Sequence, residues 1–133
     1  NLINYKRVPR RKNYLISFQT TKNIYSNPGS IEHPKSLKCK NAFIITSRSA
    51  SRRGHLSMVT ENLPAGCHSD AFTDIGTEPD FSTIQKAVQA MRFSKPDAII
   101  ALGGGSVLDA AKIIRLFYDY PELDVKELAV NFL

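Results

Sequence analysis

Three consecutive glycines, Gly103, Gly104 and Gly105, are the residues of this sequence best suited to holding a charged ligand. They follow an unbroken apolar run, Ala98–Leu102, and precede Ser106 and a helix-period pattern. Backbone without Cβ atoms can adopt positive φ and lets a ligand approach closely. A helix that starts at such a turn directs its free N–H groups and the positive end of its dipole at that ligand. The sequence therefore predicts a phosphate site, with Ser106 as the N-cap of the helix.

The spacing of the glycines argues against the two commonest phosphate-binding motifs. A P-loop needs G-x-x-x-x-G-K-[ST], and a Rossmann fingerprint needs a third glycine where Leu108 stands. Taken alone, the glycines leave a second interpretation open, in which the turn only reverses a strand into a helix.

The elements around the turn predict an α/β fold. An apolar run such as Ala98–Leu102 is typical of a strand buried on both faces, as in a parallel sheet covered by helices. Further strands are expected at 42–46 and 69–75, and helices at 55–63, from 83 onward with Ser82 or Asp80 as cap, and from 107 to 118. This alternation predicts a Rossmann-like parallel sheet with helices on both faces.

The ends of the chain are less regular. Residues 1–13 carry a basic cluster and Pro9, and we interpret them as a linker or irregular arm. A short strand is expected at 14–18. Residues 23–30 resemble a short strand and Gly-Ser turn of a family named below, and Pro34 should break or shorten the helix that would follow. A last short helix is expected at 123–132.

Charge and composition limit the partners. Residues 1–53 hold 12 Lys or Arg and one acid, and residues 54–133 hold 6 basic and 11 acidic residues, giving +11 and −5, which add to the overall +6. The basic end has no interleaved aromatic residues for base stacking, which argues against nucleic-acid binding. No apolar run approaches the roughly 20 residues that cross a bilayer, so we expect no membrane partner and a cytoplasmic protein. Cys39 and Cys67 are too few for a disulfide framework and are expected to be free thiols.

The stretch from Pro96 to Lys112 is more specific than its glycines. It resembles the cofactor-binding turn of the iron-containing alcohol dehydrogenases, P-D-x-I-I-A-x-G-G-G-S-x-x-D-x-x-K, and supplies every fixed position. The flanking sequence and the first 13 residues resemble the alcohol dehydrogenase half of bifunctional aldehyde-alcohol dehydrogenases and the linker before it. The resemblance divides the chain into a basic linker or arm, 1–13, and a truncated dinucleotide-binding domain, 14–133.

The resemblance implies a nicotinamide cofactor and assigns residues to it. Gly103 to Ser106 would hold the pyrophosphate, with Asp109 nearby, although Asp109 can equally be an acid favoured by the helix dipole. Residues 78–83 resemble the family's D-P-x-x-S-T turn near the cofactor, and Pro79 fits it.

The ribose position departs from the family. Where the family has Thr-Asp at the end of a strand, this chain has Thr46 and Ser47. A carboxylate there binds the ribose diol and repels a 2′-phosphate, which a serine does not. With Arg48, Arg52 and Arg53 beside it, the site is expected to accept NADP as well as NAD. The alternative is a solvated loop that contacts no cofactor.

The family's second, all-helical domain, which supplies the ligands of a divalent iron or zinc ion, is expected to be absent. His33, His55 and His68 match no ligand position, so we expect no metal-binding or catalytic residue in this chain. The resemblance implies interconversion of acetaldehyde and ethanol with NAD(H) in the intact enzyme and inactivity of this chain alone. It also leaves open a homo-oligomer. The alternatives are a non-catalytic binding or assembly module left by truncation and, with less support, a basic-armed nucleic-acid binder.

Overall fold

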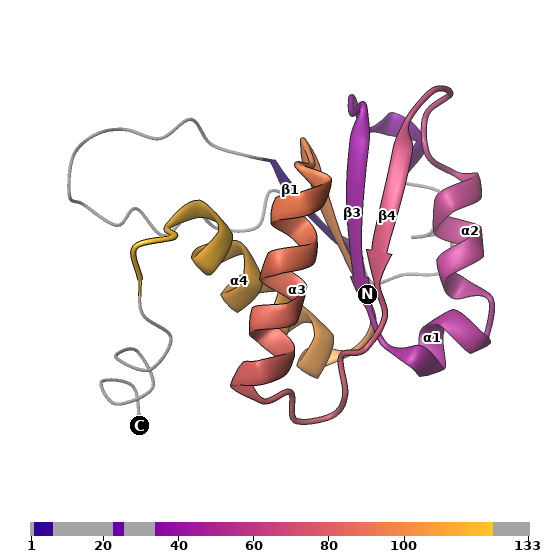
Figure 1. The fold of residues 1–133 in the computed structure, drawn as a ribbon. Coiled ribbons are helices and arrows are strands. Elements are labelled where there is room, and N and C mark those ends of the chain that lie inside the picture. Colours follow the sequence, from indigo (N-terminus) through magenta and orange to yellow (C-terminus); the bar gives the residue numbers. More distant parts are fainter. Residues whose placement is uncertain (1, 7–22, 26–33, 124–133) are drawn as a thin grey trace.

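The computed structural model describes the backbone of residues 2–6 and 23–25 and the full residues 34–123. In these segments one sheet has the strand order β2-β1-β5-β3-β4 (Figure 1). The strands are β1 (Leu2–Lys6), β2 (Asn23–Tyr25), β3 (Asn41–Thr46), β4 (His68–Phe72) and β5 (Ala98–Leu102). The helices are α1 (Arg48–Arg52), α2 (His55–Glu61), α3 (Phe81–Ser94) and α4 (Gly105–Asp119).

The centre of the sheet is parallel. β3 pairs in parallel with β5 on one side and with β4 on the other. All of β5 and nearly all of β3 are buried, which explains why both strands read as continuous apolar runs.

Helices cover both faces of these strands, with α3 and α4 on one face and α2 on the other (Figure 1). Alternate residues of β3 and β5 point to opposite faces. The first face buries Phe43, Ile45, Ile99 and Ala101 against α3 and α4; the second buries Ala42, Ile44, Ile100 and Leu102 against Val59 of α2. The predicted Rossmann-like α/β fold is confirmed.

The N-terminal segment corrects one expectation. Leu2–Lys6 form β1, which pairs antiparallel with both β5 and β2, so the sheet is mixed rather than all parallel. The interpretation of residues 1–13 as irregular was wrong for these five residues, because pairing with a distant strand stabilises a segment whose own pattern is weak. Residues 7–13 and the strand expected at 14–18 lie outside the described residues. The division of the chain at residue 13 stays a prediction.

Smaller differences concern element ends. The helix α1 was not expected, and the strand predicted at 69–75 ends at Phe72. Pro34 begins a 3₁₀ turn over 34–36, in which the Leu37 N–H donates to the Pro34 carbonyl at 3.1 Å. The helix predicted at 123–132 lies almost entirely beyond the described residues.

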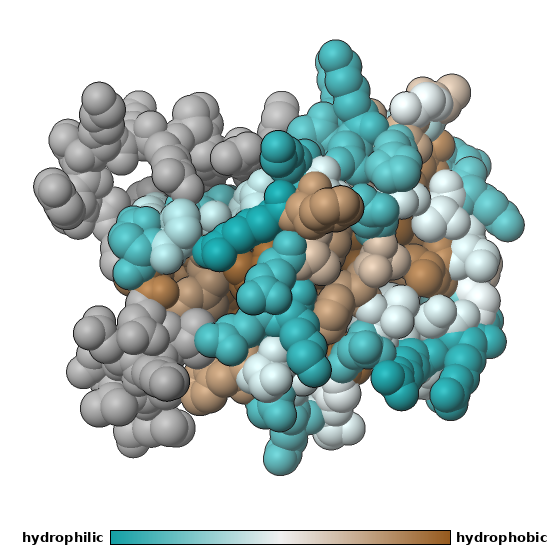
Figure 2. Space-filling view, in the orientation of Figure 1, coloured by the Kyte–Doolittle hydropathy of each residue, from teal (hydrophilic) through white to brown (hydrophobic). Residues whose placement is uncertain are grey.

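The face shown in Figure 2 carries both polar and hydrophobic side chains. On this face, hydrophobic areas are interrupted by polar side chains. Within residues 34–123, the large hydrophobic residues that are exposed are Met58, Phe81, Phe93 and Ile113. None of the described helices combines the length and the apolar character that crossing a membrane requires.

Candidate functional site

The glycine turn lies at the carboxyl edge of the sheet, where the parallel strands β3, β4 and β5 end. Gly103 follows β5 directly and has a φ of 154°, in a region that favours glycine. A Cβ on Gly103 would lie 2.8 Å from Cγ2 of Val107, closer than real contacts allow. The fold itself therefore requires a glycine at position 103.

The next two glycines are under no such constraint. Gly104 has φ −83° and ψ −169°, which any residue can adopt, and a Cβ on Gly104 or Gly105 would meet nothing within 4 Å. Protein packing thus gives no reason for glycine here. The open space above the backbone is what close approach of a ligand needs.

Gly104, and not Ser106, is the N-cap of α4. The Leu108 N–H donates to the Gly104 carbonyl at 3.1 Å, and Gly105 is already helical. The prediction of Ser106 as the cap was wrong, because Gly105 is already helical and the helix therefore begins one residue before Ser106. Ser106 is therefore the second residue of α4.

The start of α4 carries no side-chain cap, like that of the short helix α2 and in contrast to α1 and α3. Asp80 caps α3 by accepting from the Thr83 N–H at 2.8 Å, and Ser47 caps α1. Because the first N–H groups of a helix have no partner within it, those of residues 105–107 remain available at the positive end of the α4 dipole. An anion bound there would complete this helix start.

The predicted ribose residues reach the same edge. Thr46 ends β3 opposite Leu102, the residue before Gly103, and its hydroxyl donates to the Leu102 carbonyl at 2.7 Å. Thr46 is fully buried and holds the residue that precedes the glycine turn. Its contact with a cofactor stays a prediction. Ser47 follows it, and its Oγ accepts from the Ala50 N–H at 3.2 Å.

The loop between β4 and α3 also lies at the carboxyl edge, where it contacts the end of β3 and the start of α1. The Ile75 N–H donates to the Thr46 carbonyl at 3.3 Å, and Arg48 Nε lies 2.7 Å from Asp74 Oδ1. The hydrogen bond with Asp74 raises the pKa of Arg48, which stays charged. Pro79 is in this loop, immediately before the cap of α3.

Asp80, the cap of α3, is held ionised by its own contacts. The backbone N–H of Thr83, followed by the Thr83 hydroxyl, lowers the pKa of Asp80. The cap thus stays a carboxylate at neutral pH and fixes where α3 begins, just after Pro79.

Asp109 is in the second turn of α4. Its exposed carboxylate lies 3.7 Å from Nζ of Lys112, an ion pair of the i, i+3 kind. It is therefore not the first-turn acid that the dipole interpretation requires. Its contact with a cofactor stays a prediction.

The histidines that the structure describes do not form a metal site. His55 begins α2, and the Nε2 atom of the exposed His68 lies 3.4 Å from Asp70 Oδ1; His33 lies outside the described residues. Within residues 34–123, no three His, Cys, Asp or Glu side chains gather in a way that could hold a metal ion.

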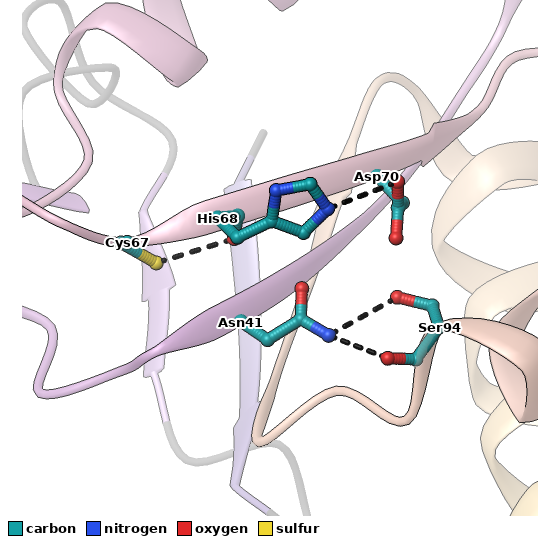
Figure 3. A network of polar contacts seen from close by, with 5 residues as sticks. All are labelled: Asn41, Cys67, His68, Asp70 and Ser94. Atoms are coloured by element: carbon teal, nitrogen blue, oxygen red, sulfur yellow. Dashed lines mark hydrogen bonds and ion pairs between the residues drawn. The ribbon is translucent and has the colours of Figure 1, made fainter.

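Sequence reasoning missed a polar network at the amino edge, where β3, β4 and β5 begin. The Asp97 carboxylate accepts from the backbone N–H groups of Lys40, at 2.9 Å, and Asn41, at 3.0 Å. The Asn41 amide in turn donates to the carbonyl and hydroxyl oxygens of Ser94 (Figure 3). Asp97 thereby joins the start of β5 to the start of β3. The cue in the sequence was an acid directly before a buried strand.

Burial alone would raise the pKa of Asp97. The hydrogen bonds from the backbone N–H groups of Lys40 and Asn41 outweigh this effect and lower its pKa below the ordinary value. Asp97 is thus an ionised structural clamp at neutral pH.

Comparison with known proteins identifies the family. The sequence model of the iron-containing alcohol dehydrogenases matches residues 21–131, which include the whole carboxyl edge described above. The chain belongs to this family. Iron-containing alcohol dehydrogenase from Thermococcus thioreducens has a similar structure, with a TM-score of 0.64 and 31% identity over 73% of this chain and 26% of that one.

Relatives of this iron-containing alcohol dehydrogenase chain include larger enzymes. The bifunctional aldehyde-alcohol dehydrogenase of Escherichia coli K12 is 36% identical over 140 aligned residues, and the aldehyde-alcohol dehydrogenase of Streptococcus pneumoniae serotype 4 is 35% identical over 139. Each alignment covers all of this chain but 16% of the relative. The NADPH-dependent butanol dehydrogenase of Clostridium saccharobutylicum is 36% identical over 81% of the chain and 28% of its own length. The resemblance to the alcohol dehydrogenase part of bifunctional enzymes is confirmed.

Proposed function

We propose that this chain is the dinucleotide-binding part of a metal-dependent alcohol dehydrogenase that interconverts acetaldehyde and ethanol with NAD(H). The observation that carries the proposal is the start of α4. This helix has no side-chain cap, and it begins at two glycines, Gly104 and Gly105, where an added Cβ atom would contact nothing. The names of the relatives that match along the whole chain support the choice of reaction.

In this proposal the backbone does most of the binding. The N–H groups of residues 105–107 donate to the diphosphate, and the dipole of α4 adds partial positive charge at the same point. Gly104 and Gly105 let the diphosphate approach the backbone. Thr46 fixes Leu102, and hence the turn, through its hydrogen bond at the end of β3.

We further propose that NADP is accepted beside NAD. Ser47 stands where a carboxylate would repel a 2′-phosphate, and Arg52 and Arg53 follow as exposed cations. Arg48 is engaged by Asp74 and contributes less. A relative whose name specifies NADPH supports the proposal.

The partner we propose, besides the nucleotide, is an all-helical domain that holds a divalent iron or zinc ion. That ion would polarise the alcohol oxygen and stabilise the negative charge that develops on it. The described residues offer no group of three metal ligands, so the chain by itself should bind nucleotide without oxidising alcohol. A homo-oligomer through this domain's faces stays a prediction.

The test is calorimetric titration of the full 133-residue chain with NADH and NADPH, comparing wild type with Gly104→Asp. The new carboxylate would occupy the helix start, so nucleotide affinity should fall at least about tenfold. The melting temperature should be unchanged or slightly higher, because aspartate is a better N-cap than glycine.

Equal NADH affinity in wild type and Gly104→Asp would contradict the site. For the cofactor choice, NADPH should bind within about tenfold of NADH. A preference for NADH of a hundredfold or more would contradict the acceptance of NADP. Measurable ethanol oxidation by the isolated chain with added iron or zinc would contradict its inactivity.

A further inference from the structure

Cys39 and Cys67 are 28 positions apart in the sequence, but their Sγ atoms lie 2.9 Å apart. The parallel register explains the contact: Asn41 of β3 pairs with His68 of β4, so the residues just before the two strands are neighbours. Cys39 lies two residues before β3, and Cys67 lies one residue before β4. The pair is thus built by the sheet itself at its amino edge.

Both cysteines are half-buried, and both pack against the smaller core cluster of the sheet, beside Leu37, Leu56 and Leu63. Figure 3 shows the Cys67 Sγ directed at the His68 carbonyl oxygen, 3.5 Å away. Apolar side chains therefore pack against the two cysteines on the side of the core, while part of each cysteine stays accessible to small molecules.

The Cys39 thiol is kept uncharged. Burial, followed by the hydrogen bond and charge of Cys67 and by the charge of Asp97, raises the pKa of Cys39 to about 12. At neutral pH the Cys39 S–H group can therefore donate to the Cys67 sulfur, which keeps the pair in contact in its reduced form.

Two thiols alone do not make a closed metal site, and none of the other His, Cys, Asp or Glu residues in the described part of the chain joins them to complete one. A disulfide is the product that two such sulfur atoms can form with each other when an oxidant accepts their two electrons. Its S–S bond of about 2.05 Å needs the atoms to move together by only about 1 Å.

We propose that Cys39 and Cys67 are an oxidisable dithiol that a low-molecular-weight disulfide, such as oxidised glutathione, converts into an intramolecular disulfide. The bond would join the amino ends of β3 and β4 and enclose β3, α1, α2 and the loops between them. It would lie at the edge of the sheet opposite the glycine turn.

The chemistry balances with one molecule of oxidant. The Cys67 thiol first loses its proton to solvent, and the resulting thiolate attacks one sulfur of oxidised glutathione, whose S–S bond breaks so that one glutathione thiolate leaves. The Cys39 sulfur then attacks Cys67 in the mixed disulfide, its proton passes to solvent, and the second glutathione thiolate leaves. Two cysteine thiols are oxidised, one disulfide is reduced, and two protons end on two glutathione molecules.

The test equilibrates the full chain in buffers of varied reduced-to-oxidised glutathione ratio, natively and in concentrated urea, with acid quenching, alkylation and mass spectrometry. The chain has two cysteines, so an internal disulfide can only be this pair. Natively, the product should be lighter by about 2 Da and resist alkylation. The glutathione ratio at which half of the chain is oxidised gives the effective concentration of one cysteine thiol at the other. This effective concentration should be at least about tenfold higher in the native chain than in urea.

Cys39→Ser and Cys67→Ser are matched controls, and each should accept one glutathione and form no internal bond. The comparison of native and unfolded wild type needs no variant, so it stands even where a variant folds poorly. Equal effective concentrations in the two states would overturn the proposal. So would native chains that carry glutathione on both cysteines, or that are cross-linked to one another, in place of the internal disulfide.

Discussion

At the amino edge of the sheet, side chains of the protein bond the backbone at the starts of the strands, whereas at the carboxyl edge the start of α4 has no side-chain cap. Asp97 accepts from two N–H groups before β3, and the amide of Asn41 reaches Ser94. Across the sheet, α4 begins without any side-chain cap and with two glycines open to space. The difference teaches that the protein's own side chains close the amino edge, whereas the carboxyl edge leaves room for the nucleotide that we propose.

The glycines of the turn also differ from one another, because packing requires a glycine at position 103 but not at position 104. The variant Gly103→Ala tests this difference. The added methyl group would clash with Val107 and would occupy a φ that alanine avoids, so the free energy of unfolding should fall by about 2–3 kcal/mol. Urea unfolding followed by circular dichroism measures it. Gly104→Ala is the matched control and should cost under about 1 kcal/mol. Equal losses would show that packing constrains both glycines.

Thr46→Val tests whether the carboxyl edge depends on its buried hydroxyl. The variant removes the donor to the Leu102 carbonyl, so the free energy of unfolding should fall by about 1–2 kcal/mol. Because Leu102 precedes Gly103, NADH affinity should fall as well, by about threefold. Unchanged affinity together with lost stability would separate Thr46 from the site.

Asp97→Asn tests the amino edge and should have the smallest effect, because this carboxylate is exposed to water. At neutral pH the free energy of unfolding should fall by about 1 kcal/mol, with NADH affinity unchanged. The pKa of Asp97 is lowered in the folded state. Its contribution is therefore present above its unfolded pKa of about 4 and is lost as the pH falls through the folded value.

Urea unfolding at about pH 7 and about pH 3 measures this dependence. Wild type and Asp97→Asn should differ at the higher pH and approach each other at the lower one. A difference that is constant over this range would mean that the charge of Asp97 contributes nothing to the clamp.

The sequence predicted the strand–turn–helix unit because two local signals agree there. Ala98–Leu102 is apolar throughout, and residues 107–118 repeat with a helical period. The helix α1 was missed because Arg48–Arg52 has no such period and buries only Ala50. The strand β1 was missed because its partner β5 is about a hundred residues away, and pairing at that distance leaves no local pattern.

The candidate site was likewise predictable where local sequence signals exist and not where distant residues meet. The residues near the turn were found from their order in the chain, but the roles of Thr46 and Ser47 depend on atoms that meet only in the fold. Cys39 and Cys67 show the limit most clearly, since a parallel register and not their spacing brings them together.

The position of β1 has a practical consequence for anyone preparing this protein. A shortened version that starts after residue 13 would lack β1 and would leave one side of β5 without its hydrogen-bonding neighbour. An apolar strand with a bare row of N–H and C=O groups is a template for other chains. We expect such a version to precipitate or to pair with itself, and the first six residues should be kept.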